Sequence, residues 1–569
     1  MNPAIVTLLC FLGYLAAYFG YARFLARRVF HLDGSAVTPA HALGDGIDYV
    51  PTNRYVLFGH HYASIAGLSP MLGPAIAVIW GWVPALLWVV LGTALIGAVH
   101  DFSALVVSMR ARGMSIGRVA EDIMGRRAKT LFHLIIFFLV ALAMGVFVYV
   151  VATLFTDAYH PETVGPTFSL MALAVVMGWL IYRRGFRIAP LTAVSVLVML
   201  ILVWFGMEMP LRGIGVGTWS WILLAYAFLA SVLPVWLLLQ PRDFINAMLL
   251  YLGVGLIFLG FFVLGPSFQA PAFAPSPEGA PSLFPFVFIT IACGAISGFH
   301  GLVSSGTTAK QIDRETDATL IGYGGMIGES LLGLAAVLAT TCGFGTSEAW
   351  SEHYQNWGVA SRLSANIGAF IDGAGLFVSR LGVPVEIARS FVTVIAISFA
   401  LTSLDTAARL LRYNISEIGD TLKLRALGNR YLASALAVSA IAFFAFFRIG
   451  GRPAGLALWQ LFGTTNQILG GLTLLAVSLY LLQKGWPARY TLLPMAFMMV
   501  TTLAAMAAKI RDFGSAWAAD GEAGNLLLLV TGVLLMGLSV WLAVEAMIRF
   551  VQFRRGVLPP MQPGHPGAG

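Results

Sequence analysis

Residues 58–74 read Phe-Gly-His-His-Tyr-Ala-Ser-Ile-Ala-Gly-Leu-Ser-Pro-Met-Leu-Gly-Pro, a stretch with three glycines and two prolines. Glycine and proline at this density interrupt a helix and leave backbone N–H and C=O groups unpaired. The stretch lies in an apolar segment long enough to cross a bilayer, where unpaired backbone is tolerated only against protein or a water-filled cavity. Residues 58–74 therefore predict a broken membrane helix.

A second stretch, residues 297–308, reads Ser-Gly-Phe-His-Gly-Leu-Val-Ser-Ser-Gly-Thr-Thr and repeats the same pattern. Each stretch contains Gly-x-His, then five residues, then Gly-x-Ser or Gly-x-Thr. Paired interrupted helices that cross in opposite directions are typical of an inverted repeat, with the substrate held between them. Alternatively, small residues simply let helices pack closely, but close packing explains the glycines better than the neighbouring imidazoles.

The composition excludes a soluble protein. Of 569 residues, 59% are apolar and 11% are charged, too few charges to cover a soluble domain of this size. Apolar runs of about 20 residues recur along the chain and are continuous rather than alternating, which favours helices over a barrel. The sequence predicts an all-α polytopic membrane protein with about fifteen transmembrane helices. We expect them near 3–24, 55–80, 83–108, 131–156, 166–182, 188–207, 219–240, 245–265, 284–309, 320–343, 385–406, 431–448, 453–482, 490–508 and 524–548.

The charged residues set the expected orientation. The net charge of +8 comes from arginines and lysines in short loops, which argues for membrane topology and against nucleic-acid binding. Basic loops alternate with loops poor in basic residues, so the N-terminus is expected outside and the C-terminus in the cytoplasm. Two basic pairs, Arg448/Arg452 and Lys509/Arg511, fall on the wrong side. We expect residues 3–24 to be a retained helix rather than a cleaved signal.

Four regions follow from this pattern. Residues 1–54 are expected to form an extra N-terminal helix and a cytoplasmic loop, 55–482 the transporter core, 483–557 a C-terminal helix pair and 558–569 a disordered tail. Within the core, the semi-polar stretch 344–384 is interpreted as carrying an amphipathic helix on the outer surface, with a true span as the alternative.

Several polar groups interrupt the other spans. His100 and Asp101 are either functional or, for Asp101, an ion-pair partner of Arg110. Thr402, Ser403 and Asp405 could hold a sodium ion through oxygens or carry a proton, or else cap a helix near Arg409. We interpret residues 240–243 as a structural turn or gate. Asn466 and Gln467 are interpreted as joining helices, and the three cysteines as small core residues.

No hydrolase motif and no phosphate-binding loop is present in the sequence. An intramembrane hydrolase or an ATP-driven pump therefore has no visible machinery, and we do not expect an enzyme. No cofactor is expected beyond a coupling H⁺ or Na⁺.

At residues 59–67, followed by Pro70 and Gly73-Pro74, the sequence resembles the carbon starvation protein A family. Three further stretches support the resemblance: residues 97–102, residues 297–300 with 304–308, and residues 461–463 with 466–467. The resemblance implies a bacterial inner-membrane transporter of the amino acid–polyamine–organocation type, with a LeuT-like fold containing inverted repeats and two broken helices. It also implies cation-coupled uptake of peptides or pyruvate during carbon starvation.

The chain departs from the family pattern in ways that bear on the substrate rather than on the class. Gly67-Leu68-Ser69-Pro70 stands where the family commonly has Gly-Ala-Gly-Pro, and Ala309 stands where it has proline. Long members of the family also continue beyond this C-terminus.

The leading hypothesis is a proton- or sodium-coupled symporter for a small organic solute in the lipid bilayer. The rival is a membrane sensor that binds the same solute without moving it, although no output domain is visible. Oligomeric state is left open. The candidate substrate-binding residues are His60, His61, Ser64, Gly67, Ser69, His300, Ser304, Ser305, Gly306, Thr307 and Thr308. The candidate ion-coupling residues are His100, Asp101, Thr402, Ser403 and Asp405, with Thr402 and Ser403 as a candidate sodium site.

Overall fold

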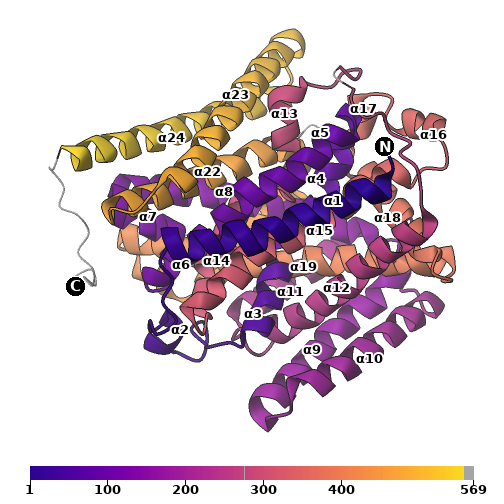
Figure 1. The fold of residues 1–569 in the computed structure, drawn as a ribbon, viewed down its shortest axis with the longest axis horizontal. Helices are drawn as coiled ribbons and strands as arrows, with labels where there is room; N and C mark the ends of the chain where they lie inside the picture. Colours follow the sequence, from indigo (N-terminus) through magenta and orange to yellow (C-terminus); the bar gives the residue numbers. More distant parts are fainter. Residues whose placement is uncertain (275, 450–451, 556–569) are drawn as a thin grey trace.

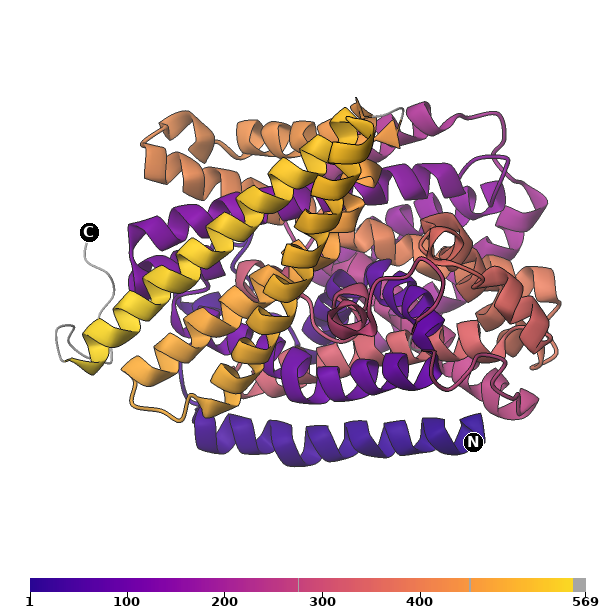
Figure 2. The ribbon, with the colours of Figure 1, turned by 90° about the horizontal axis from the view of Figure 1, so that it is seen from above.

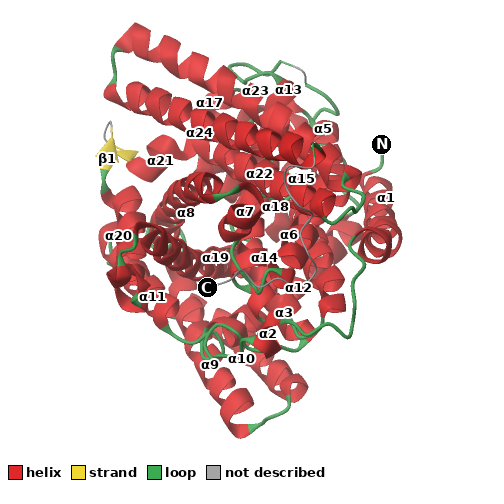
Figure 3. Ribbon diagram, turned by 90° about the vertical axis from the view of Figure 1, so that its left-hand side faces the viewer, coloured by secondary structure: helices red, strands yellow, loops and turns green. Residues whose placement is uncertain are grey.

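Helices make up nearly all of the fold (Figure 3). The structure is a computed structural model that describes residues 1–274, 276–449 and 452–555. The predicted disordered tail, 558–569, lies outside the described residues. Strands β1 (Arg448–Ile449) and β2 (Arg452–Pro453) form a two-residue antiparallel pair. The first half of the chain contains α1 (Pro3–Ala16), α2 (Pro39–Ala42), α3 (Arg54–Ile65), α4 (Ser69–Ala77), α5 (Trp82–Leu87), α6 (Ala98–Arg110), α7 (Ile116–Met124), α8 (Arg126–Leu154), α9 (Val164–Arg184), α10 (Ile188–Glu208), α11 (Val216–Val232) and α12 (Leu239–Leu264).

The second half of the chain contains the remaining α-helices. They are α13 (Leu283–Thr290), α14 (Gly298–Gly306), α15 (Gly325–Cys342), α16 (Ser347–His353), α17 (Trp357–Ala360), α18 (Leu363–Ser379), α19 (Val385–Leu422), α20 (Arg430–Phe446), α21 (Ala454–Leu458), α22 (Phe462–Gln483), α23 (Arg489–Asp520) and α24 (Ala523–Arg554). Short π-helical segments extend several of them; residues 88–97, for example, join α5 to α6 as one continuous helical run from Trp82 to Arg110.

Over the described ranges, ten helices are long and apolar enough to cross a membrane, or eleven if α3 and α4 count together as one span. Three further expected spans, 188–207, 219–240 and 431–448, correspond to shorter apolar helices. The expected span 284–309 is divided between α13 and α14. The count of about fifteen membrane helices therefore stays a prediction, while the mostly helical, multi-span character is clear.

Burial separates a central group of helices from a peripheral one. Helices α15, α19 and α22 are almost completely enclosed, whereas α1 and α24 expose large apolar side chains such as Leu12, at 61%, and Trp541, at 52%. Helix α1 lies along one edge of the molecule in Figure 2, and α9 packs beside α10 at another edge in Figure 1. Exposed apolar faces of this extent are stable against lipid rather than water.

Helix α18, in the stretch 344–384, is enclosed by other helices and does not leave one face open, as an amphipathic helix on the outer membrane surface would. It packs against α4, α12, α15 and α19, and most of its described side chains are buried. Glycines permit this position: a Cβ on Gly373 would lie 2.2 Å from the carbonyl oxygen of Ala339 in α15. The interpretation as an amphipathic surface helix overlooked how closely these glycines let neighbouring helices approach.

The backbone is interrupted at two places that lie deep in the fold. Residues 66–68 interrupt the helix between α3 and α4, and the helix axis bends by 49° at this break. Residues 291–297 are irregular between α13 and α14, and Gly294 there has a left-handed φ of 90°. The first interruption falls within the expected stretch 58–74.

The second interruption precedes most of the expected stretch 297–308. Residues 298–306 are helical, and the hydroxyl groups of Ser305 and Thr307 bond to the preceding turn rather than breaking the helix. Ser305 Oγ donates to the carbonyl oxygen of Gly301, and Thr307 Oγ1 donates to that of Val303. Such bonds to the preceding turn are a common way for serine and threonine to remain in a helix.

Replacing Gly97 by alanine should destabilise the protein, because its Cβ would lie 2.0 Å from the carbonyl oxygen of Ala295 in the irregular segment 291–297. We expect a loss of about 1–3 kcal/mol, typical of overpacking, seen as a lower thermal midpoint in detergent. The control is Gly255→Ala in α12, where no atom lies within 4 Å of the added Cβ. Equal midpoints for the two variants would contradict this prediction.

Candidate functional site

A small internal cavity lies between the two interruptions. Its volume is about 20 Å³, which is room for about one water molecule. The lining combines the α3–α4 connection, the segment 291–297 with α14, and helices α8, α19 and α22. The residues are Ile65, Gly67, Ser69, Leu139, Ala143, Met144, Phe147, Cys293, Phe299, Ser403 and Phe462.

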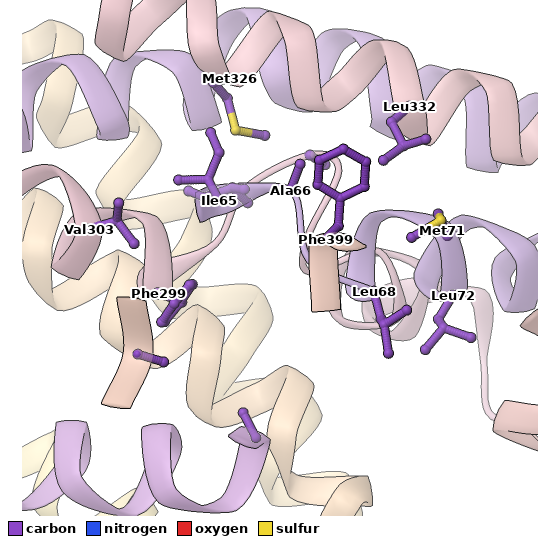
Figure 4. Close-up of a cluster of buried hydrophobic side chains, with 14 of the residues drawn as sticks. Ile65, Ala66, Leu68, Met71, Leu72, Phe299, Val303, Met326, Leu332 and Phe399 are labelled. Carbon is purple, nitrogen blue, oxygen red and sulfur yellow. The ribbon is translucent and has the colours of Figure 1, made fainter. Parts of the chain in front are cut away.

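Figure 4 shows apolar side chains from both interrupted regions, Ile65 and Phe299 among them, in one buried cluster. The cavity wall is largely apolar, with few polar groups from Ser69, Cys293 and Ser403. Sites for small organic molecules usually combine an apolar wall with a few placed polar groups. Of the predicted residues, Gly67, Ser69 and Ser403 line this cavity.

The acid–imidazole cluster comprises His100, Asp101, His300 and Glu329, all of which are fully buried. The two oxygens of Asp101 accept hydrogen bonds from His100 Nδ1 at 2.8 Å and from His300 Nδ1 at 2.9 Å. The other imidazole nitrogen of His300 lies 3.3 Å from Glu329 Oε2. The predicted residues His100, Asp101 and His300 are therefore brought together, from α6 and α14, and α15 adds an acid that the sequence analysis missed.

The arginine cluster comprises Arg242, Asp243, Asp405, Tyr226 and His60. Arg242 pairs with Asp405 of α19 and, at 3.1 Å, with Asp243 beside it in α12. Asp405 also accepts a hydrogen bond from the Tyr226 hydroxyl at 2.5 Å, and His60 Nδ1 donates to Asp243 Oδ2 at 2.5 Å. Residues 240–243, interpreted as a turn or gate, lie in the first turns of α12 rather than in a turn, and Arg242 supplies the central cation. Their role as a gate stays a prediction.

The remaining predicted residues tie helices together around these clusters. His61 Nδ1 lies 2.9 Å from Thr308 Oγ1, and Ser64 Oγ lies 3.0 Å from Thr406 Oγ1. Ser403 Oγ donates to the carbonyl oxygen of Ser64 at 3.1 Å. Four further predicted residues are buried but do not line the cavity: Ser304, Ser305, Gly306 and Thr307.

The structure contradicts the purely structural roles that the sequence left open for Asp101 and Asp405. Asp101 does not pair with Arg110, because Arg110 Nε donates to Glu315 Oε1 at 2.7 Å instead. Thr402, Ser403 and Asp405 do not cap a helix, because they lie in the middle of α19. The nearby Arg409 binds Asp48 of the loop before α3 at 2.9 Å. Burial raises the pKa of Asp48, but Arg409 and the neighbouring Arg412 more than offset this effect and lower its pKa overall.

Asn466 and Gln467 join helices, as interpreted. Asn466 Oδ1 accepts the backbone N–H of Phe299 at 2.9 Å, and its Nδ2 donates to Ser297 Oγ at 2.9 Å. Gln467 donates to the carbonyl oxygen of Phe288 in α13. Helix α22 therefore supplies partners to polar groups at and around the second interruption. Cys10, Cys293 and Cys342 are all buried and free.

Known proteins resemble this chain over most of its length, including both interruptions. The family model described as carbon starvation protein CstA matches residues 2–348 and 344–505. This chain belongs to the CstA carbon starvation family. The resemblance stated from residues 59–74 is thus confirmed. A peptide transporter CstA of Campylobacter jejuni is 33% identical over 559 residues, covering 86% of this chain and 78% of that protein.

A pyruvate/proton symporter, BtsT of Escherichia coli, is 38% identical over 344 residues, covering 58% of this chain and 47% of that protein. Among solved structures, MhsT in complex with L-phenylalanine has a TM-score of 0.47 and 11% identity, covering 86% of this chain and 99% of that chain. The two relatives, a peptide transporter and a pyruvate/proton symporter, are transporters rather than enzymes, so the expectation that the chain is not an enzyme is confirmed. The chain is a multi-pass membrane protein of a transporter family.

Removing Arg242 should destabilise the protein strongly, because the two aspartates that it joins would remain buried without a cation. We expect Arg242→Met to lower the free energy of unfolding by about 3–5 kcal/mol, measured by thermal unfolding in detergent. The matched control is Arg389→Met, since Arg389 pairs with Asp372 at 2.9 Å where both side chains are largely exposed. That control should cost about 0–1 kcal/mol, and a comparable cost at both sites would refute the prediction.

Proposed function

We propose that the chain is a cation-coupled symporter that imports a small organic solute, such as pyruvate or a short peptide, during carbon starvation. The main support for this proposal is the cavity. It is lined by two separate backbone interruptions, at 66–68 and 291–297, together with α8, α19 and α22. In this proposal the interruptions are the broken helices of a LeuT-like inverted repeat, and the solute binds between them.

One of the few polar groups in the cavity wall suits a carboxylate. Helix α4 begins at Ser69, which lines the cavity, and the N-terminus of a helix favours negative charge. Pyruvate and the C-terminal end of a peptide both carry this group. The relatives' names, peptide transporter and pyruvate/proton symporter, point to the same two solute classes.

A volume of about 20 Å³ is too small for any of these solutes. Binding therefore requires the walls to move apart, which fits a carrier whose site opens to one side of the membrane at a time. The interruptions provide the places where the wall can move, because there the backbone is not held by a continuous helical ladder.

The acid–imidazole cluster supports coupling to a proton. It contains two acids and two imidazoles, and the described residues provide no arginine or lysine partner for either acid. With His300 protonated, the two acids still leave a net charge of −1, which an additional proton would remove. Buried ionisable groups of this kind in membrane proteins commonly mark proton pathways.

The side chains of the candidate sodium site give less support to sodium as the coupling ion. Thr402 Oγ1 accepts from Asn246 Nδ2 at 2.8 Å and donates to the carbonyl oxygen of Ser398 at 2.8 Å. Ser403 Oγ is bonded to Ser64, and Asp405 is bonded to Arg242 and Tyr226. A hard cation needs several free oxygen ligands, and among these three side chains only Asp405 has an oxygen, Oδ1, without a hydrogen-bond partner.

The proposed location is the bacterial inner membrane, with the N-terminus outside and the C-terminus in the cytoplasm, as the loop charges favour. The rival function, a sensor, predicts solute binding without exchange. Counterflow separates the two, because only a carrier exchanges internal for external solute.

Proteoliposomes containing the purified chain should accumulate labelled pyruvate or dipeptide when an inward proton gradient is imposed. Gly67→Ala should raise the solute concentration for half-maximal uptake about tenfold, because its Cβ would lie 2.8 Å from Ser403 Oγ and 3.0 Å from the Phe147 ring. Gly255→Ala is the control. Absence of gradient-driven uptake and of counterflow across a broad solute panel would contradict the proposal.

Replacing Glu329 by glutamine should uncouple transport from the proton gradient. The amide keeps the shape of the side chain but cannot take up or release the coupling proton, so accumulation should be lost while counterflow exchange continues. Glu348→Gln, on the exposed helix α16, should leave both intact. Full proton-driven accumulation by Glu329→Gln would remove Glu329 from the coupling mechanism.

A further inference from the structure

Three groups that commonly ligate metals converge beside the cavity. Cys293 Sγ, a ring nitrogen of His300 and a carboxylate oxygen of Glu329 all lie within 4.8 Å of one another, and all three residues are buried. They come from three different segments: the irregular segment 291–297, α14 and α15. Cys293 also lines the cavity, so the group borders the proposed solute site.

The facing atoms of His300 and Glu329 lack hydrogen-bond partners. Both carboxylate oxygens of Glu329 and Nε2 of His300 are buried and accept or donate no hydrogen bond. Nε2 of His300 and Oε2 of Glu329 lie 3.3 Å apart, so the two groups form an ion pair only when His300 is protonated. A buried carboxylate without hydrogen bonds is costly, by several kcal/mol, and a bound cation is one way to satisfy it.

The surrounding contacts orient these atoms as in metal centres. Asp101 accepts the Nδ1 proton of His300 at 2.9 Å, which leaves the lone pair on Nε2 directed at Glu329. A carboxylate that fixes a histidine in this way is the usual outer partner of a metal-binding imidazole. On the other side, the Cys293 thiol donates to Ser297 Oγ at 3.2 Å, and Asn466 holds Ser297.

We propose that Cys293, His300 and Glu329 form a binding site for a thiophilic divalent transition-metal ion of the zinc class. Thiolate, imidazole and carboxylate are all zinc ligands, whereas Na⁺, Mg²⁺ and Ca²⁺ prefer oxygen ligands alone. The thiolate and carboxylate together neutralise a divalent ion. Three protein ligands leave the fourth tetrahedral position to a solvent molecule.

Binding exchanges protons for the metal. The Cys293 thiol must lose its proton to become a ligand, and His300 must be free of a proton on Nε2, so one or two protons leave as one ion enters. The affinity should therefore fall as the pH falls. If the proposed function is right, the metal and the coupling proton compete for His300 and Glu329; the metal site itself does not depend on that function.

Cobalt binding to the purified full-length chain tests this site directly. After chelator treatment, Co²⁺ should bind at one ion per chain, give a thiolate-to-cobalt charge-transfer band in the near ultraviolet, and be displaced by Zn²⁺. Zn²⁺ added to weakly buffered protein should release protons, detected with an indicator dye. Asp101→Asn should weaken the affinity about 10–100-fold through the loss of the outer partner.

The near-isosteric variants Cys293→Ser and Glu329→Gln should lose the band and the proton release. Cys342→Ser, which changes another buried cysteine, should keep both. Size-exclusion profiles and thermal midpoints identify any variant that misfolds, and Asp101→Asn then provides an independent arm. An absent band, or a band that survives in Cys293→Ser, overturns the proposal.

The proposed transport function stands or falls on a different measurement. A chain that binds Co²⁺ through Cys293 but shows neither uptake nor counterflow retains the metal site and loses the symporter. A chain that transports with proton coupling but binds no Co²⁺ has a proton site alone at His300 and Glu329.

Discussion

Lipid offers no hydrogen-bond partners, so every interruption of a helix in this fold has to be completed by another part of the protein. Asn466 shows how this is done at the second interruption. One amide side chain accepts the N–H of Phe299 and binds Ser297, and thereby fixes the start of α14 against α22. The position of His300, one residue further along α14, follows from this bond. The acid–imidazole cluster and the cavity both depend on it.

The same constraint explains how much the sequence could predict. Continuous apolar runs predicted a helical membrane protein because no other backbone arrangement satisfies itself in lipid. The glycines and prolines of 58–74 predicted an irregular region that contains residues 66–68. At 297–308 the same reasoning placed the irregular backbone too late, because composition does not show whether a serine hydroxyl breaks a helix or bonds back to it, as Ser305 does.

The candidate site was predictable in kind but not in its pairings. His100, Asp101 and His300 were singled out as polar groups inside apolar spans, and they do meet. Glu329 carried the same signal, a carboxylate inside an expected span, and was overlooked. That Arg242 pairs with Asp405, 163 positions away, depends on the approach of α12 to α19, and residue spacing along one chain does not report such distances. The apolar neighbours of Cys293 in the sequence predicted a small core residue. They do not indicate that His300 and Glu329 lie beside it in the fold.

Helix α19 contains 38 residues and is about 57 Å long at 1.5 Å per residue, nearly twice the roughly 30 Å of a hydrocarbon core. From Val385 to Ile418 it has neither proline nor glycine, so it has no built-in hinge and behaves as a rod. This rod carries both Ser403 at the cavity and Arg409 at the loop that contains Asp48, about 1.7 turns apart. Any tilt of α19 must therefore move both at once, so that a displacement of the cavity wall at Ser403 is also felt by the loop at Asp48.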